Sequence, residues 1–196
     1  MLKRIYGHGR GWVFTPTHFK DLGSRNAIAS ALKRYKQTGL IRQLGRGLYD
    51  YPQSDPELGI LQPSANALAR AIAGREAARL QPTGAYAANL LGLSTQVPVK
   101  ITWLTDAPSR TVRVGKRQII LRHTTPRNLA CAGKVSGLII QALRYLGQKN
   151  VDQQVIAQLN KILDDQSRKQ LAKSVQYAPA WIADIIRDLV DMEKVE

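Results

Sequence analysis

The stretch that decides the fold is SRNAIASALKRYKQTGLIRQLGRGLYDY, residues 24–51. Ser24 is a good N-cap, because its hydroxyl can accept a hydrogen bond from the free N–H groups of a first helical turn. Apolar side chains then recur at i, i+4 and i+7, which predicts a single apolar stripe. The stripe consists of Ile28, Leu32 and Tyr35. We therefore expect an amphipathic helix that begins after Ser24 and stops at Gly39.

A tight basic hairpin is predicted directly after this helix. Residues 40–44 and 48–51 favour two strands, and Gly45-Arg46-Gly47 supplies the turn. A helix with one apolar and one basic face, followed by a hairpin with arginine at its tip, is typical of a winged-helix DNA-binding domain. There the helix enters a major groove and the wing lies along the backbone. The alternative is an ordinary helix and hairpin with solvated charges.

The charge of the chain points to a polyanionic partner. Its 196 residues include 29 lysines and arginines against 14 acidic residues, a formal net charge of +15. Residues 1–51 hold 10 basic and 2 acidic residues, whereas residues 164–196 hold 5 and 7. The positive field therefore covers the N-terminal part and the middle. Nucleic acid is the partner that such a field favours, and a solvated basic surface without a specific partner is the alternative.

Composition also limits the compartment. A single cysteine, Cys131, excludes an intramolecular disulfide and suits a reducing compartment. The first residues lack the apolar segment of a signal peptide, and no apolar run reaches the length of a membrane span. We expect a cytoplasmic protein without a membrane partner.

Neither a catalytic site nor a metal or cofactor site is predicted. With one cysteine and three unpaired histidines, no set of metal ligands can be assembled at the usual spacings. The glycine-rich segment at 7–11 lacks the lysine and hydroxyl residue of a phosphate-binding loop. The histidines, expected at the surface or in packing, are His8, His18 and His123.

The whole chain predicts an α+β fold in two parts. The order short helix, strand, helix, helix, strand, wing, strand assigns residues 1–55 to a winged helix-turn-helix domain. The proline-rich stretch at 52–63 is the best linker. Residues 63–196 are assigned to a larger mixed domain with a small antiparallel sheet and C-terminal helices. Its strands are expected at 99–105, 111–114 and 117–122, and its helices at 63–80, 85–91, 135–146, 151–163, 167–175 and from Pro179 onward.

The predicted hairpin at 110–122 concentrates positive charge. Its side chains form either one solvated face or a second surface for nucleic acid or an anionic partner, and the sequence leaves both readings open. The residues concerned are Arg110, Arg113, Lys116, Arg117 and Arg122.

Several separated blocks resemble the AbiEi-type antitoxins of type IV toxin–antitoxin systems. The blocks are GRGLYDYP at 45–52, TGAYAANLLGLSTQVP at 83–98 followed by ITWLTD, and RTVRVGKRQIILRHTTPRN at 110–128. The similarity runs from Gly11 to about Gly147. It implies an N-terminal winged-helix domain that binds operator DNA and represses its own operon. It also implies a C-terminal antitoxin domain that counteracts a nucleotidyltransferase-like toxin, and it leaves direct contact with that toxin open.

The resemblance also assigns the residues that read DNA. They are Arg25, Asn26, Ser30, Lys33 and Arg34 on the helix, with Arg42 and Arg46 on the wing. Their chemistry agrees with this assignment. Asn26 can pair with the edge of an adenine, and Arg25 or Lys33 with that of a guanine. Arg42 and Arg46 suit phosphates, which set the register without reading sequence.

Two other classes of function stay open. One is a stand-alone winged-helix regulator whose C-terminal domain senses a ligand or forms an oligomer. The other is an RNA-binding or nucleic-acid-processing enzyme, which the missing catalytic constellation disfavours. A toxin gene directly downstream would favour the antitoxin over the stand-alone regulator.

Overall fold

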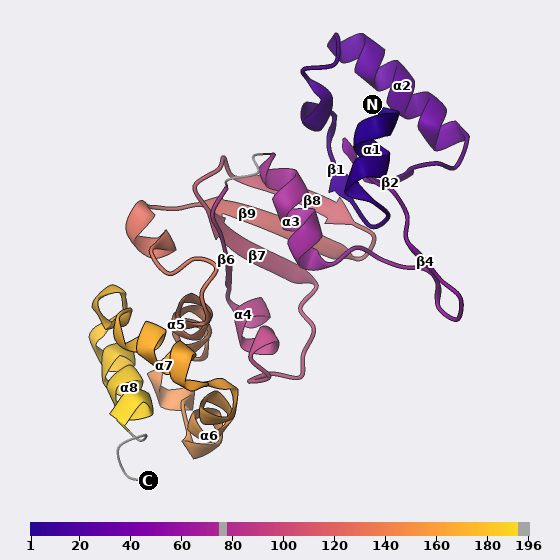
Figure 1. Cartoon of the computed structure of the whole chain (residues 1–196). Helices are drawn as coiled ribbons and strands as arrows, with labels where there is room; N and C mark the ends of the chain where they lie inside the picture. Colours follow the sequence, from indigo (N-terminus) through magenta and orange to yellow (C-terminus); the bar gives the residue numbers. More distant parts are fainter. Residues whose placement is uncertain (75–77, 192–196) are drawn as a thin grey trace. The chain divides into compact units, whose positions relative to one another are not determined.

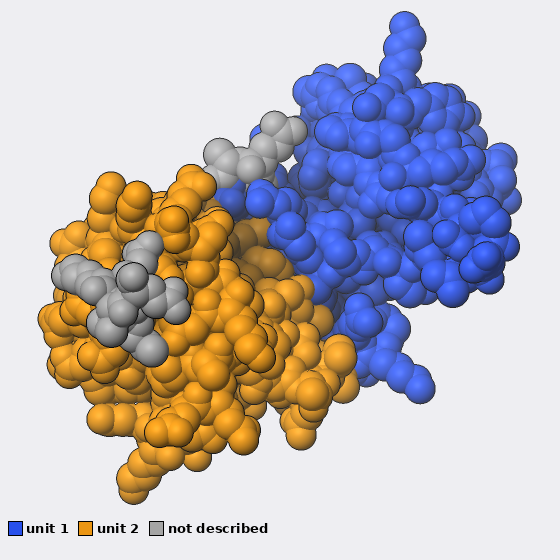
Figure 2. Space-filling view, turned by 60° about the horizontal axis from the view of Figure 1, so that its bottom comes forward, with its two compact units in different colours: residues 1–78, 110–121 blue, residues 79–109, 122–196 orange. Residues whose placement is uncertain are grey.

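The computed structural model describes residues 1–74 and 78–191 and confirms an α+β fold with small antiparallel sheets and C-terminal helices (Figure 1). The chain divides into two compact units, coloured in Figure 2. Unit 1 comprises residues 1–78 and 110–121, and unit 2 comprises residues 79–109 and 122–196. The two domains predicted from the sequence, residues 1–55 and 63–196, were separated at the proline-rich stretch and have other bounds than these units. That residues 1–55 and 63–196 are separate domains stays a prediction.

Unit 1 contains the N-terminal elements and a hairpin from the middle of the chain. Its elements are α1 (Leu2–His8), β1 (Val13–Phe14), the 3₁₀ turn η1 (Pro16–Phe19), α2 (Arg25–Gln37), β2 (Arg42–Gly45), β3 (Leu48–Asp50), β4 (Ser54–Asp55), β5 (Gly59–Ile60), α3 (Ala65–Ala73), β8 (Arg110–Val114) and most of β9 (Arg117–His123).

The predicted start and stop of α2 are confirmed. The Ser24 hydroxyl accepts a hydrogen bond from the Ala27 N–H at 3.3 Å. At the other end Gly39 adopts a φ of 72°, a left-handed conformation that residues with a side chain rarely adopt. Ile28 and Leu32 are buried. α2 is therefore held by its apolar stripe, and its remaining surface is left to solvent.

A three-stranded antiparallel sheet in the order β1-β3-β2 lies beneath α2. Phe14 of β1 packs edge-to-face against Phe19 with 5.4 Å between ring centroids, and Trp12 lies 4.6 Å from Phe14. Tyr49 of β3 and Tyr51, directly after that strand, are partly buried against the same cluster. Aromatic rings thus supply much of a small core.

The predicted linker contains a short hairpin of its own. β4 and β5 pair antiparallel within residues 54–60. The Asp55 carboxylate accepts hydrogen bonds from the backbone N–H groups of Leu58 and Glu57, which lower its pKa. Leu58 at the turn is 77% exposed. The stretch is therefore a small ordered hairpin and adds little to a core.

The helix expected at 63–80 is too long, and a strand is missed at its end. α3 ends at Ala73, where Gly74 adopts a left-handed φ of 71°. Residues 75–77 of the expected helix lie outside the described residues. The chain then enters β6 (Leu80–Thr83), which pairs with β7 so that Pro82 lies opposite Trp103. Proline is disfavoured inside a sheet, but an edge strand such as β6 tolerates it because one side of its backbone needs no ladder partner.

Unit 2 is mainly helical. It contains β6, α4 (Ala85–Leu90), β7 (Lys100–Thr105), η2 (Pro126–Leu129), α5 (Val135–Leu146), η3 (Gln148–Asn150), α6 (Gln153–Ile162), α7 (Asp165–Ala172), η4 (Val175–Tyr177) and α8 (Ala180–Asp191). α5 packs against α4, β6, α7 and α8. The buried side chains of this cluster, such as Leu143 of α5 and Ile182 and Ile186 of α8, are almost all aliphatic. No helix within residues 1–74 and 78–191 has the length and apolarity to cross a membrane.

Candidate nucleic-acid interface

α2 presents a polar face to solvent. Asn26, Ser30 and Lys33 are all exposed and recur at i, i+4 and i+7, so they lie in one row along the helix. The buried residues on the opposite side include Ile28 and Leu32. The row therefore carries an amide, a hydroxyl and an ammonium group that the fold leaves available, which is a set of groups able to meet base edges.

Two further cations lie near this row. Arg34 is exposed, next to Lys33 in the chain. Lys36 donates a hydrogen bond from Nζ to Oε1 of Gln43 at 3.2 Å, which ties the end of α2 to β2. The positive charge at the C-terminal half of α2 also interacts favourably with the partial negative charge of the helix end.

Arg25 lies on a different side of α2 from the row. Successive residues of an α-helix point about 100° apart, so Arg25 turns away from Asn26. It lines a cleft together with the buried Ile28. The predicted set of DNA-reading residues on α2 is therefore divided between the exposed face and this cleft.

The β2–β3 hairpin has Arg46 at its tip, and Gly45 beside it lies close to the backbone of β8. Arg46 is exposed, and Gly47 beside it adopts a left-handed φ of 67°. A Cβ on Gly45 would lie 2.7 Å from the carbonyl oxygen of Arg113, so only glycine fits there. β2 consequently lies directly against β8, and this contact determines where the hairpin tip points.

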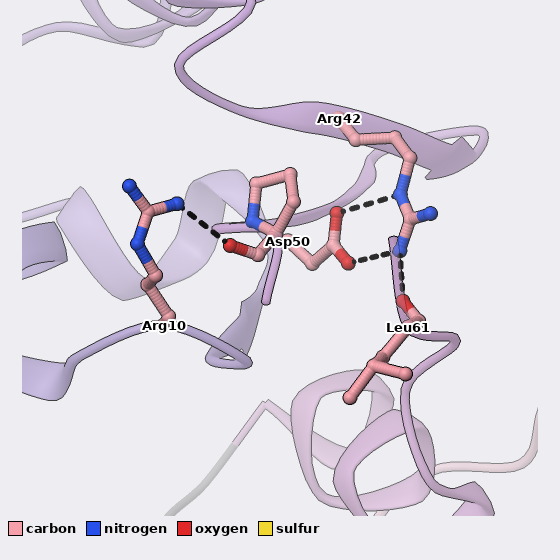
Figure 3. A network of polar contacts seen from close by, with 5 residues as sticks. Arg10, Arg42, Asp50 and Leu61 are labelled. Carbon is pink, nitrogen blue, oxygen red and sulfur yellow. Dashed lines mark hydrogen bonds and ion pairs between the residues drawn. The ribbon is translucent and has the colours of Figure 1, made fainter. Parts of the chain in front are cut away.

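Arg42, predicted to hold a phosphate, is occupied within the protein (Figure 3). Its Nε and Nη2 donate to the two carboxylate oxygens of Asp50 at 3.2 and 2.6 Å, and Nη2 also donates to the carbonyl of Leu61 at 3.0 Å. Asp50 is 1% exposed. Because a buried carboxylate without a partner is costly, Arg42 serves to neutralise it and to hold the chain that leads to α3.

The basic residues of the β8–β9 hairpin do not form a single face. Side chains alternate along a strand, so Arg110 and Arg113 point to opposite sides of β8. Arg110 donates from Nη1 to the carbonyl of Ile72 at 3.2 Å, at the end of α3. The other four, all exposed, are Arg113, Lys116, Arg117 and Arg122.

A cleft of about 530 Å³ in unit 1 brings together residues that the sequence does not connect. Its cationic side chains are Lys20, Arg25, Arg46 and Arg110. Neither the place of Lys20 in this cleft nor the proximity of Arg110 to Arg25 was predicted from the sequence. No local pattern could have shown this, because the four residues lie on separate elements of the chain.

Unit 1 also carries most of the net charge. It contains 16 lysines and arginines against 5 acidic residues, whereas unit 2 contains 13 against 9. Of the acids of unit 1, Asp21 is paired with Arg4 at 2.7 Å and Asp50 with Arg42. The Arg4 hydrogen bond holds the pKa of Asp21 at about 2. These pairs leave the cations of α2 and of the hairpin tip to act on solvent or on a ligand.

The described part of the chain offers no group of three or more histidine, cysteine or acidic side chains that could hold a metal ion. His8 stacks on Trp12 with 4.0 Å between ring centroids, and His18 Nδ1 lies 3.0 Å from the Thr15 hydroxyl. Cys131 is buried. These side chains contribute to packing and local hydrogen bonds.

Comparison with known proteins identifies a family. No curated protein matches the chain. A family model does match, over residues 1–171, and therefore covers unit 1 and most of unit 2. The chain belongs to the family of unknown function DUF6088.

Proposed function

We propose that this protein is a cytoplasmic DNA-binding transcriptional autorepressor and the antitoxin of a type IV toxin–antitoxin system. Its N-terminal helices and the β1-β3-β2 sheet act as a winged helix-turn-helix domain in this proposal. The observation that carries it is the exposed polar row of Asn26, Ser30 and Lys33 on α2. The row stands on a helix whose opposite side is anchored in a core, as a reading helix requires.

The roles of the individual side chains follow from their chemistry. Asn26 donates to and accepts from an adenine edge, and Lys33 donates to guanine acceptors. Arg46 at the hairpin tip contacts a backbone phosphate, which fixes register and adds affinity without sequence information. Arg42 is not included, because Asp50 and Leu61 already engage two of its nitrogens.

The antitoxin part of the proposal comes from the resemblance, and unit 2 supports a narrower choice of contact residues. Within the block at 83–98, Ala87 and Ala88 are fully buried and belong to the core. Leu90 and Val97 are 48% and 68% exposed. Exposed apolar side chains are the residues of this block that a protein partner could cover. We therefore place a candidate toxin contact on Leu90 and Val97.

The DNA-binding part is tested by fluorescence anisotropy with a duplex from the region upstream of the gene. A scrambled duplex of the same length and composition serves as the control, and both are titrated at several salt concentrations. We expect tighter binding to the upstream duplex at every salt concentration. Equal affinity for both duplexes would show that the protein binds DNA only through non-specific electrostatic attraction and would refute the repressor role.

The antitoxin part needs a separate experiment. The downstream gene product is expressed in a host with and without this protein, and growth is measured. We expect the protein to restore growth, also when Asn26 is replaced by alanine, because repression and neutralisation reside in different units. A toxic neighbour that the protein fails to neutralise would favour a stand-alone regulator.

A further inference from the structure

The cleft in unit 1 has the size and lining of a small-molecule site. Its volume of about 530 Å³ is within the usual range for ligand pockets, roughly 300–1,000 Å³. It lies among η1, the start of α2, the β2–β3 turn, α3 and β8. Every lining residue belongs to unit 1, so the cleft is a property of that unit alone.

The cleft collects positive charge, and the carboxylate that interacts electrostatically with one of its cations, Asp21 beside Lys20, is already hydrogen-bonded to Arg4. Lys20, Arg25, Arg46 and Arg110 are exposed and come from four different segments. Within residues 1–74 and 78–191, none of them forms an ion pair with a carboxylate. Like charges held around one cavity repel each other, and a multiply charged anion between them relieves that repulsion.

The floor of the cleft is apolar. Ile28, Leu48 and Ile72 line it and are 5%, 1% and 2% exposed, and Val112 adds a partly buried side chain. An inorganic anion would leave this surface uncovered. A ligand that carries both an anionic group and a flat or apolar body would cover the floor and meet the cations at the rim.

Two contacts hold the walls in place. Arg110 donates from Nη1 to the carbonyl of Ile72 at 3.2 Å, so its guanidinium is oriented before any ligand arrives. Gly45 allows β2 to approach the backbone of Arg113, which fixes the Arg46 turn opposite β8. A cleft with prearranged charges loses less conformational entropy on binding than one that must order flexible side chains.

We propose that this cleft binds a small phosphorylated ligand with a planar or apolar body, of the size of a nucleoside di- or triphosphate. The phosphoryl groups lie against the four cations, where arginine can donate two parallel hydrogen bonds to each group. The body lies on the floor formed by Ile28, Leu48 and Ile72. The backbone of a DNA duplex also presents phosphates, but it has no apolar body to fill a concave floor.

Isothermal titration calorimetry with ATP and with inorganic pyrophosphate tests the proposal on the full-length protein without DNA. We expect saturable 1:1 binding of ATP and weaker binding of pyrophosphate, because pyrophosphate leaves the apolar floor uncovered. Replacing Arg110 by glutamine should weaken ATP binding roughly tenfold, the usual value of one charge-assisted hydrogen bond. Arg113→Gln, on the opposite side of the same strand, should change the affinity less than twofold, by about 0.4 kcal/mol.

A second cleft variant shows whether a loss of ATP binding in Arg110→Gln comes from a disturbed fold. Because Arg110 also bonds to α3, Lys20→Gln serves as an independent cleft variant, with Lys116→Gln as its matched control. Saturable ATP binding that falls in both cleft variants and in neither control supports the site. Absence of saturable binding, or equal losses in cleft and control variants, overturns it.

The source of the phosphate is distinguished by the same variants. Neither Lys20 nor Arg110 is among the residues of α2 and of the β2–β3 hairpin that we assign to DNA, so their substitution tests the cleft without removing a proposed base contact. If both variants weaken binding to a duplex while the wild-type protein shows no binding of ATP, the cleft holds a DNA phosphate and the small-ligand proposal is wrong. ATP binding in a protein that fails to distinguish its upstream duplex would support the cleft and refute the repressor.

Discussion

Helix α2 in unit 1 and helix α5 in unit 2 are nearly equal in length but have opposite surroundings. α2 has 13 residues, of which Ile28, Ala31 and Leu32 are buried. α5 has 12 residues, and most of its central residues are buried. α2 is therefore a surface helix with one anchored side, whereas α5 is a helix around which unit 2 is packed.

The polar residues of the two helices show what this difference means. In α5, Ser136 accepts from the Ser174 hydroxyl at 2.9 Å, and Gln141 accepts from the Thr83 hydroxyl at 2.8 Å. In α2, within the part of the chain that the structure describes, Asn26 and Ser30 have no such partner. Similar side chains thus stabilise the fold in α5 and remain available for a ligand in α2.

The largest effect is expected from breaking the buried ion pair that supports unit 1. Arg42→Met leaves the Asp50 carboxylate buried without a partner, and we expect a loss of about 3 kcal/mol in the free energy of unfolding. Urea denaturation of both proteins measures it. Arg10→Met, which removes one hydrogen bond to the Pro52 carbonyl and a contact with the ring of Tyr51, is the neighbouring control and should cost about 1 kcal/mol. Equal costs for the two would show that Asp50 finds another partner.

Unit 2 should lose stability when a side chain is added where α5 lies closest to its neighbours. A Cβ on Gly137 would collide with the carbonyl oxygen of Cys131 and with Oε1 of Gln81. Gly137→Ala should lower the free energy of unfolding by roughly 1–3 kcal/mol, as overpacking does in other cores. The control is Gly7→Ala in α1, where a Cβ meets nothing within 4 Å. There the higher helix propensity of alanine should raise stability by about 0.5–1 kcal/mol. An unchanged free energy of unfolding in Gly137→Ala would mean that the residues around α5 move to accommodate the added methyl group.

One substitution tests whether the exposed row of α2 recognises bases. Asn26→Ala should reduce discrimination at one base pair of the operator by about 1–3 kcal/mol, because a bidentate contact is lost. Anisotropy competition with single-base-pair variants of the upstream duplex measures it. Asn150→Ala in unit 2 is the matched control. Unchanged discrimination in Asn26→Ala would refute its role as a reading residue.

A smaller and less selective effect is expected at the hairpin tip. Arg46→Ala should weaken binding to all duplexes alike and lower the slope of log affinity against log salt by about 0.9, the contribution of one phosphate. Arg144→Ala removes an exposed arginine from α5 of unit 2 and should leave the slope unchanged. A loss confined to one operator sequence would show that Arg46 reads a base.

The smallest effect concerns the surface ion pair between Arg4 of α1 and Asp21, in the segment between η1 and α2. Hydrogen bonding from Arg4 lowers the pKa of Asp21 from 3.8 to about 2. A lowered folded-state pKa stabilises the protein above the unfolded value, and this contribution is lost as pH falls from about 4 to about 2. Asp21→Asn should therefore flatten the decline of thermal stability over this range and lower stability slightly at neutral pH. An identical decline in the variant would show that the pair contributes nothing.

Periodicity and caps predicted much of the fold because they act locally. Ser24 and Gly39 predicted the ends of α2, and the strands predicted at 111–114 and 117–122 agree closely with β8 and β9. β6, which contains Pro82, was not predicted, because whether a strand tolerates proline depends on which strand is at the edge of a sheet. That information lies in the tertiary structure.

The candidate site was predicted only in its local part. The helical row at Asn26, Ser30 and Lys33 follows from spacing along one helix. The engagement of Arg42 depends on a partner across the strand pair, and the cleft depends on Arg110 lying near Arg25, 85 positions apart in the chain. Residues so far apart in the chain become neighbours only in the folded protein, so no local sequence pattern can predict their contact.

The return of the chain to unit 1 at 110–121 has a consequence for synthesis. A ribosome delivers the N-terminal helices, the hairpin and α3 first, then residues 79–109 of unit 2, and only then the strand that carries Arg110 and Val112. Unit 1 is therefore incomplete while a long stretch of another folding unit is being translated. The nascent chain can form α2 and its aromatic core early, but the cleft exists only once β8 has emerged.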